Sequence, residues 1–266
     1  MNSVGPAWLF CPADRPERYG KAAAVADVVI LDLEDGVAAA DRPAAREALR
    51  NTPLDPERTV VRVNPAGTED QARDLEALAD TAYTTVMLAK TESAAQVAAL
   101  APREVVALIE TPRGAVFCAE IAAAEQCVAM MWGAEDLVAA MGGGSSRHAD
   151  GRYRDVARHV RSSVLLAAST FGRAALDAVY LNIGDLDGLR AEALDGAAVG
   201  FAATVCIHPS QIAVVRDAYR PAPERVDWAR RVLAAAQTER GVFAFEGQMV
   251  DSPVLRHAEA ILRRAD

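Results

Sequence analysis

Short apolar runs recur eight times along the chain, and most of them end in polar residues. Runs that are apolar almost throughout are typical of strands buried on both faces, as in a parallel sheet, because a strand with one exposed face would alternate polar and apolar positions. We therefore predict strands at residues 7–13, 28–35, 59–65, 84–90, 104–111, 127–136, 176–182 and 203–210.

The segments between these runs are rich in alanine and carry charges at intervals, which is typical of amphipathic helices. Proline near a first turn marks several helix starts, as at Pro16, Pro43 and Pro112. We predict helices at residues 16–26, 42–50, 69–79, 93–100, 115–124, 152–171, 186–199 and 211–219.

Strand and helix thus alternate eight times, and this alternation predicts an α/β fold, a (β/α)8 TIM barrel. A doubly wound open sheet is the alternative. It would usually carry a glycine-rich phosphate turn after the first strand, and residues 11–15 (CPADR) do not form one. The length of 266 residues agrees with the roughly 250 residues that a barrel takes.

A C-terminal extension follows the predicted barrel. We assign residues 1–220 to the barrel and residues 221–266 to the extension. Within the extension, the pattern predicts helices at 224–238 and 254–264, with a loop or irregular segment at 243–253.

Composition narrows the classes of partner. A net charge of −9 argues against broad affinity for nucleic acid or for an anionic membrane surface. No apolar run reaches the roughly 18 residues of a membrane span, and the N-terminus lacks a basic segment followed by a long apolar stretch. The four cysteines form no CxxC pair, so we expect free thiols and a cytoplasmic location.

Polar side chains gather at the carboxyl ends of the predicted strands, which form the functional face of a barrel. Burying several acids beside apolar runs is costly unless a cation or a metal neutralises them. Carboxylates outnumber the cations here, and ligation by oxygen with few protein ligands suits Mg²⁺. The strand-end residues are Asp32, Glu34, Asp35, Arg62, Asn64, Lys90, Glu110, Glu135, Asp136, His208 and Ser210.

Two mechanisms are compatible with these residues. One is metal-assisted chemistry on a substrate whose oxygens complete the Mg²⁺ shell. The other is a Schiff base on an amine. The chain has only two lysines, Lys21 and Lys90, and of these Lys90 stands at a predicted strand end. The number of carboxylates favours the metal, and the Schiff base remains the alternative.

Motifs at these strand ends carry a family resemblance. They occur in one order over nearly the whole chain and read PADRPERYGKA, LDLEDGV, VRVN, LAKTES, LIETPRGA, WGAEDL, IHPSQ and GQMVDSP. Together they resemble the HpcH/HpaI aldolase and citrate lyase β-subunit (CitE-like) family, most closely its stand-alone members from mycobacteria. Any single motif is a weak signal, whereas eight in order make a specific match.

The resemblance implies a barrel of the phosphoenolpyruvate-binding type, Mg²⁺, and cleavage or formation of a carbon–carbon bond in a 3-hydroxyacyl-CoA thioester through a thioester enolate. The acyl group would be of the citramalyl, malyl, hydroxymethylglutaryl or citryl type, and a keto acid would be the partner product. The alternative within the family is a catalytically silent subunit that binds CoA or assembles a citrate-lyase-like complex.

The resemblance also assigns roles to residues at the strand ends. Glu110 and Asp136 match the family's metal ligands, and Arg62 matches the arginine that contacts the substrate and its thioester oxygen. Glu34 and Asp35 match an acidic pair beside the metal, and we count Glu34 among the catalytic residues. The structural alternatives are that the two metal ligands are helix-start charges and that Arg62 simply pairs with Glu34.

Three further residues match functional positions of the family. Arg15 and Lys21 match a region that meets the CoA phosphates, and their alternative is a plain helix surface. Asp251 matches a tail aspartate that acts as acid and base in a neighbouring subunit's site, which implies a homo-oligomer, a trimer. Its alternative is a turn residue before Pro253. The glycine-rich residues 142–146 are either a lid or CoA-side loop, or a surface turn.

Overall fold

The computed structural model describes residues 5–239 and 241–265. The chain forms two compact units, Met1–Val215 and Arg216–Asp266. We placed the end of the barrel at residue 220, and the first unit ends slightly earlier, within helix α10 (Gln211–Tyr219). Among the described residues, no helix is long and apolar enough to span a membrane.

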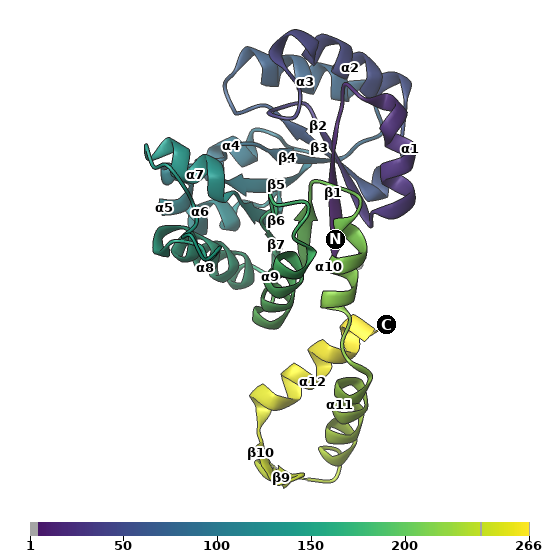
Figure 1. Cartoon of the computed structure of the whole chain (residues 1–266), viewed down its shortest axis with the longest axis vertical. Coiled ribbons are helices and arrows are strands. Elements are labelled where there is room, and N and C mark those ends of the chain that lie inside the picture. Colours follow the sequence, from purple (N-terminus) through teal and green to yellow (C-terminus); the bar gives the residue numbers. More distant parts are fainter. Residues whose placement is uncertain (1–4, 240, 266) are drawn as a thin grey trace. The chain divides into compact units, whose positions relative to one another are not determined.

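Eight parallel strands close into a barrel in the first unit, in the order in which they follow one another along the chain (Figure 1). Strand β1 pairs with both β2 and β8, which closes the sheet and leaves it without an edge. The predicted α/β TIM barrel is therefore confirmed. The strands are β1 (Ala7–Pro12), β2 (Val28–Asp32), β3 (Thr59–Val63), β4 (Thr85–Leu88), β5 (Glu104–Ile109), β6 (Cys127–Trp132), β7 (Ala174–Asp177) and β8 (Ala203–Cys206).

Helices follow the strands and lie outside the barrel (Figure 1). The predicted helix at 115–124 is two short helices. The first starts earlier than predicted, because the Thr111 side chain accepts a hydrogen bond from Gly114 N–H and caps it. The helices before α10 are α1 (Pro16–Val25), α2 (Arg42–Asn51), α3 (Glu69–Ala79), α4 (Ala94–Ala98), α5 (Pro112–Val116), α6 (Cys118–Ala123), α7 (Ala134–Ala140), α8 (Asp155–Thr170) and α9 (Leu186–Val199), with 3₁₀ turns at Ala39–Asp41 and Pro56–Arg58.

The predicted strands all run past the carboxyl ends of the observed strands, by the largest margins at β6, β7 and β8. We predicted the seventh strand at 176–182, but β7 is Ala174–Asp177 and pairs with β6 through Ala174, Ala175 and Leu176. The apolar residues after it, including Val179 and Leu181, line a cavity instead of continuing the strand. The sixth strand was predicted to reach residue 136, but it ends at Trp132 and α7 begins at Ala134.

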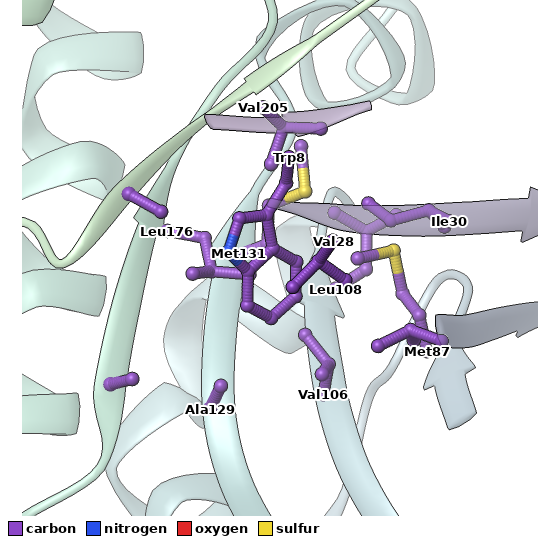
Figure 2. Close-up of a cluster of buried hydrophobic side chains, with 13 residues drawn as sticks. Trp8, Val28, Ile30, Met87, Val106, Leu108, Ala129, Met131, Leu176 and Val205 are labelled. Carbon is purple, nitrogen blue, oxygen red and sulfur yellow. The ribbon is translucent and has the colours of Figure 1, made fainter. Parts of the chain in front are cut away.

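Apolar side chains fill the interior of the barrel. Trp8, Ile30, Met87, Leu108 and Met131 all belong to this buried cluster, with the further members that Figure 2 shows. A packed interior is the rule in TIM barrels, so a ligand cannot pass through the barrel and must bind at its carboxyl-terminal face.

The second unit holds a helical pair and a short hairpin. Helices α11 (Pro223–Ala235) and α12 (Ser252–Ala265) pack through a cluster that includes Val232 and Ala258. The segment predicted as irregular instead contains strands β9 (Phe243–Phe245) and β10 (Gln248–Val250), which are antiparallel. Their two-residue loop, Glu246 and Gly247, has positive φ at both positions, as in the type I′ turn that suits hairpins.

Candidate active site at the carboxyl end of the barrel

A cavity of about 370 Å³ lies in the first unit at the carboxyl ends of the strands. One part of its wall is apolar, and the other part carries charges. The apolar part includes Phe10, Leu108, Met131, Val179, Leu181 and Ile207, and the charged part consists of Asp32, Asp35, Arg62, Glu110, Glu135 and Asp136.

Arg62 is the buried cation of this cavity. Its guanidinium forms two hydrogen bonds to the Asp32 carboxylate, at 2.7 and 2.6 Å, and an ion pair with Glu34 at 3.1 Å. It also lies over the ring of Phe10, 4.7 Å from the ring centre. Burial opposes its charge, but the neighbouring carboxylates outweigh burial and raise the pKa of Arg62. The group is therefore a permanent, fixed cation.

Asp32 organises the chain that follows β2. Besides pairing with Arg62, its carboxylate accepts hydrogen bonds from the N–H groups of Glu34 (3.0 Å) and Gly36 (2.9 Å). A Cβ atom on residue 36 would collide with that carboxylate, so the position requires glycine. Sequence reasoning noted Asp32 at a strand end but assigned it no role. Its pairing with Arg62 is visible only once β2 and β3 are neighbours.

Lys90 follows β4 in a left-handed backbone conformation, with φ of 51°. Its N–H donates a hydrogen bond to Oε1 of Glu110 (2.9 Å). Its ammonium contacts three carboxylates: Glu34, Asp35 at 3.0 Å and Asp136 at 3.5 Å. Burial opposes the charge, but the hydrogen bonds to the acids outweigh it and raise the pKa of Lys90.

Glu110 is almost fully buried, with 3% of its surface exposed. Burial raises its pKa to about 8, the negative charge of Asp136 adds to the effect, and Arg62 and Lys90 offset part of it. A Cβ on residue 133 would come within 2.9 Å of the Glu110 carboxylate, so Gly133 leaves the room that this side chain needs.

Glu34 and Asp35, the acidic pair after β2, have pKa values that are shifted in opposite directions. Burial raises the pKa of Glu34 and outweighs the lowering effects of Arg62 and Lys90. For Asp35, burial is opposed by the hydrogen bond from Lys90, and the net effect lowers the pKa of Asp35. At neutral pH, Asp35 is therefore a fixed anion, whereas Glu34 is the more readily protonated of the two.

Asp136 and Glu135 lie in the first turn of α7, so both carboxylates stand at a helix N-terminus, which for Asp136 is the position that the structural alternative gave it. Asp136 is partly exposed to the cavity. Glu135 accepts a 2.5 Å hydrogen bond from the buried Ser146 hydroxyl. Sequence reasoning did not identify this link, which brings the glycine-rich segment to the edge of the site.

The carboxylates of the cavity are better suited to a magnesium ion, which needs few protein ligands, than to a metal whose ligands all come from the protein. In the described part of the chain, no three His, Cys, Asp or Glu side chains are grouped as ligands of one metal. Mg²⁺ is usually held by one or two carboxylates, with waters and substrate oxygens completing its shell. Glu110 and Asp136 line one cavity, and the negative charge of Asp136 makes ionisation of the buried Glu110 more costly, which a bound cation would offset.

The structure brings together five of the predicted site residues: Glu34, Asp35, Arg62, Glu110 and Asp136. Of the remaining three, Arg15 and Lys21 lie outside this cluster in the first unit, and Asp251 belongs to the second unit.

Arg15 is the N-cap residue of α1 and pairs with Asp14 at 3.4 Å, and Lys21 is exposed on the same helix. Asp251 belongs to the second unit, where its carboxylate accepts a hydrogen bond from Val254 N–H (3.2 Å) and caps α12. The cap agrees with the turn alternative and leaves a catalytic role untested.

Residues 7–209 match the sequence profile described as HpcH/HpaI aldolase/citrate lyase. The chain belongs to this family. It is 75% identical over 265 residues to the citrate lyase subunit beta-like protein of Mycobacterium tuberculosis, covering 100% of this chain and 97% of that protein. It is 31% identical over 287 residues to the human mitochondrial citramalyl-CoA lyase, covering 95% of this chain and 83% of that enzyme.

The fold is also similar to a solved member of the family. The crystal structure of CitE from Mycobacterium tuberculosis in complex with magnesium, acetoacetate and coenzyme A matches with a TM-score of 0.96 and 75% identity, covering 100% of this chain and 99% of that chain. The resemblance inferred from the eight motifs is thereby confirmed, and so is the expected class of enzyme, a lyase of the CoA-ester and citrate lyase type.

Proposed function

We propose that the protein is a Mg²⁺-dependent carbon–carbon lyase that cleaves, or forms, a 3-hydroxyacyl-CoA thioester through a thioester enolate. The observation that carries the proposal is the convergence of Glu110, Asp136 and Arg62 on one cavity. Two acids that can hold a cation thus share a cavity with one fixed guanidinium. A reaction that produces an enolate needs the cation and the guanidinium, because both stabilise negative charge that develops on oxygen. The magnesium complex of the similar CitE structure supports this assignment.

Glu110 and Asp136 would hold the metal in this proposal. Mg²⁺ bound there would polarise the hydroxyl oxygen of the substrate and an adjacent carboxylate. The N–H of Lys90 orients the Glu110 carboxylate for this role. Burial makes the charged form of Glu110 costly and raises its pKa, and a cation bound beside it would stabilise that charged form.

Arg62 would stabilise the thioester oxygen as negative charge develops on it. Its two hydrogen bonds to Asp32 hold the guanidinium in place before the reaction begins. Donors that are fixed in advance need no reorganisation at the transition state, which is why they are effective. The apolar neighbours Phe10 and Leu108 lower the local polarity and strengthen the interaction.

Glu34 would act as the base. It would accept the proton of the 3-hydroxyl group while the bond between the hydroxyl carbon and the neighbouring CH₂ breaks, which yields the keto acid and the enolate of the shorter acyl-CoA. Asp251 of a neighbouring subunit would then protonate the enolate carbon. We propose that the extension of residues 221–266 completes a neighbour's site in a homotrimer, and that Arg15 and Lys21 contact the CoA phosphates.

The decisive experiment is turnover of a panel of CoA thioesters with Mg²⁺: citramalyl, malyl, hydroxymethylglutaryl and citryl. We expect at least one to release acyl-CoA and a keto acid, and chelation to stop the reaction. Glu110→Gln should abolish it, whereas the matched exposed-site change Glu120→Gln should not. Arg62→Lys should lower kcat by about 10²–10³-fold, as loss of an oxyanion donor does.

Binding of Mg²⁺ and acetyl-CoA without turnover of any thioester would favour the second candidate, a silent binding or assembly subunit. The Schiff-base alternative is disfavoured by the three carboxylates around Lys90, which keep its amine protonated and so non-nucleophilic. Borohydride reduction in the presence of substrate should leave Lys90 unmodified. A trapped adduct would restore that mechanism.

A further inference from the structure

Lys90 contacts more of the site than any assigned role explains. It is one of two lysines in the chain. Its backbone adopts a left-handed conformation that residues other than glycine rarely take, and such conformations persist where the surroundings enforce them. Both its N–H and its ammonium are directed at carboxylates of the cavity.

The contacts of Lys90 join two sides of the barrel. Its ammonium pairs with Glu34 and Asp35 after β2 and with Asp136 in the first turn of α7. Its N–H meanwhile holds Glu110 after β5. Lys90 therefore contacts both proposed metal ligands: Glu110 through its main-chain N–H and Asp136 through its ammonium group.

The balance of charge shows why this matters. Six carboxylates of the cluster, those of Asp32, Glu34, Asp35, Glu110, Glu135 and Asp136, face two cations. Arg62 is bound by Asp32 and Glu34, so it cannot turn to the acids after β5 and β6 without breaking a buried pair. Among the described residues, Lys90 is the cation within ion-pair distance of Asp136.

We propose that Lys90 is the internal counter-ion of this acid cluster: its ammonium neutralises the carboxylates while no divalent ion is present, and it thereby sets how tightly that ion binds. The inference rests on the proposed assignment of Glu110 and Asp136 as metal ligands. Lys90 is then a positioning residue, because it acts on the metal through the carboxylates that it contacts.

The direction of the effect follows from Coulomb's law. An ammonium close to Asp136 repels an arriving divalent cation and also stabilises the metal-free protein. Removal of the charge abolishes the repulsion and leaves the buried Glu34 and its neighbours short of a counter-charge. Both changes favour the metal-bound state, so we expect Mg²⁺ to bind Lys90→Met about tenfold more tightly than the wild type.

The test is Mg²⁺ titration by calorimetry of the full-length wild type, Lys90→Met and Lys90→Arg, with unfolding followed in EDTA and in Mg²⁺. Lys90→Met should bind more tightly, unfold earlier in EDTA and gain more stability from Mg²⁺ than the wild type. Lys90→Arg keeps the charge and should return the dissociation constant toward the wild-type value. Lys21→Met, the same change at the other lysine, should leave Mg²⁺ affinity unchanged.

A second measurement does not depend on the variants folding well. Wild-type protein labelled with ¹³C at lysine Cε has two lysine signals, and Mg²⁺ should shift that of Lys90 and leave that of Lys21 in place. An unshifted Lys90 signal, or an Mg²⁺ affinity of Lys90→Met that is equal to or weaker than that of the wild type, overturns the proposal for Lys90 alone.

Two other outcomes concern the metal site itself. Absence of Mg²⁺ binding in the wild type overturns both this proposal and the metal site. Wild-type affinity in Glu110→Gln overturns the assignment of Glu110 as a ligand.

Discussion

At the scale of single residues, the site is a set of charges that the barrel interior makes costly. Arg62 lies among carboxylates that neutralise it, whereas Glu110 lies beside another acid and is buried. A buried charge is tolerated only when it is paired. The unpaired acid therefore marks the place where a cation belongs, and its titration gives a measurable consequence.

The raised pKa of Glu110 predicts a pH dependence of stability and of metal binding. In the metal-free protein this pKa lies at about 8, against 4.5 for an unperturbed group, so the folded state holds a proton that the unfolded state has lost. Stability should fall as pH rises from about 4.5 to about 8. Below about pH 8, Mg²⁺ must displace that proton, so its affinity should rise up to about tenfold per pH unit and then level off.

Calorimetry at about pH 6.5 and about pH 8.5, in buffers of different protonation enthalpy, measures both the affinity and the released proton. Thermal unfolding in EDTA across the same range measures the stability. The isosteric change Glu110→Gln should remove the decline in stability between pH 4.5 and 8. An affinity that does not change with pH would contradict the raised pKa.

At the scale of elements, side chains of the loop between α7 and α8 hold it against the barrel, and Arg147 makes the largest set of these contacts. Arg147 lies between the rings of Tyr153 (3.7 Å) and Tyr180 (5.1 Å) and pairs with Glu192 of α9. Tyr153 in turn packs edge-on against Trp132 at the end of β6, with ring centres 5.0 Å apart. These contacts support the loop from which Ser146 reaches Glu135.

We predict that Arg147→Lys loosens residues 142–154 without disturbing the strands. Lysine keeps the charge but loses the planar group that stacks on two rings. The loss should cost about 1 kcal/mol, as a cation–π contact of this kind contributes. Hydrogen exchange followed by mass spectrometry should show faster exchange in the loop only. Arg152→Lys, at an exposed arginine of the same loop, is the matched control and should exchange as the wild type does.

Equal exchange in Arg147→Lys and Arg152→Lys would show that the stacked arginine does not hold the loop. Faster exchange that extended into β6 and β7 would instead indicate that the arginine supports the barrel as a whole.

At the scale of the whole molecule, the residues that the proposed mechanism uses belong to two compact units. The first unit holds the cavity with the proposed metal ligands. The second unit holds Asp251, whose carboxylate caps α12. If this aspartate serves a neighbouring subunit, two inactive variants with different defects should restore one another.

Complementation tests this arrangement. Glu110→Gln disables the barrel site, and Asp251→Asn removes the acid but keeps a residue that caps a helix equally well. Each variant alone should be inactive, whereas co-expressed chains should regain turnover because some sites receive both intact residues. Light scattering should give the mass of a trimer. Mixed oligomers without activity, or full activity of Asp251→Asn alone, would remove the tail from the mechanism.

Much of the fold could be predicted from the sequence because local patterning determined it. Near-continuous apolar runs and the helices between them indicated eight strand–helix units, and the barrel has them. Two of the errors share one cause. Val179 and Leu181 are apolar because they face a cavity, and Glu246-Gly247 makes a hairpin turn without the Asn-Gly signal, so in both places the role of the residue depended on its surroundings.

By itself the sequence determined the family, the barrel and which carboxylates stand at strand ends, because these depend on residue order and on the period of the apolar pattern. The tertiary structure alone decided which charges neutralise one another. Asp32 pairs with Arg62 from the adjacent strand, and Lys90 reaches Asp136, which lies on the far side of β5. Ion pairing depends on distance and burial in space, and neither can be read from separation along the chain.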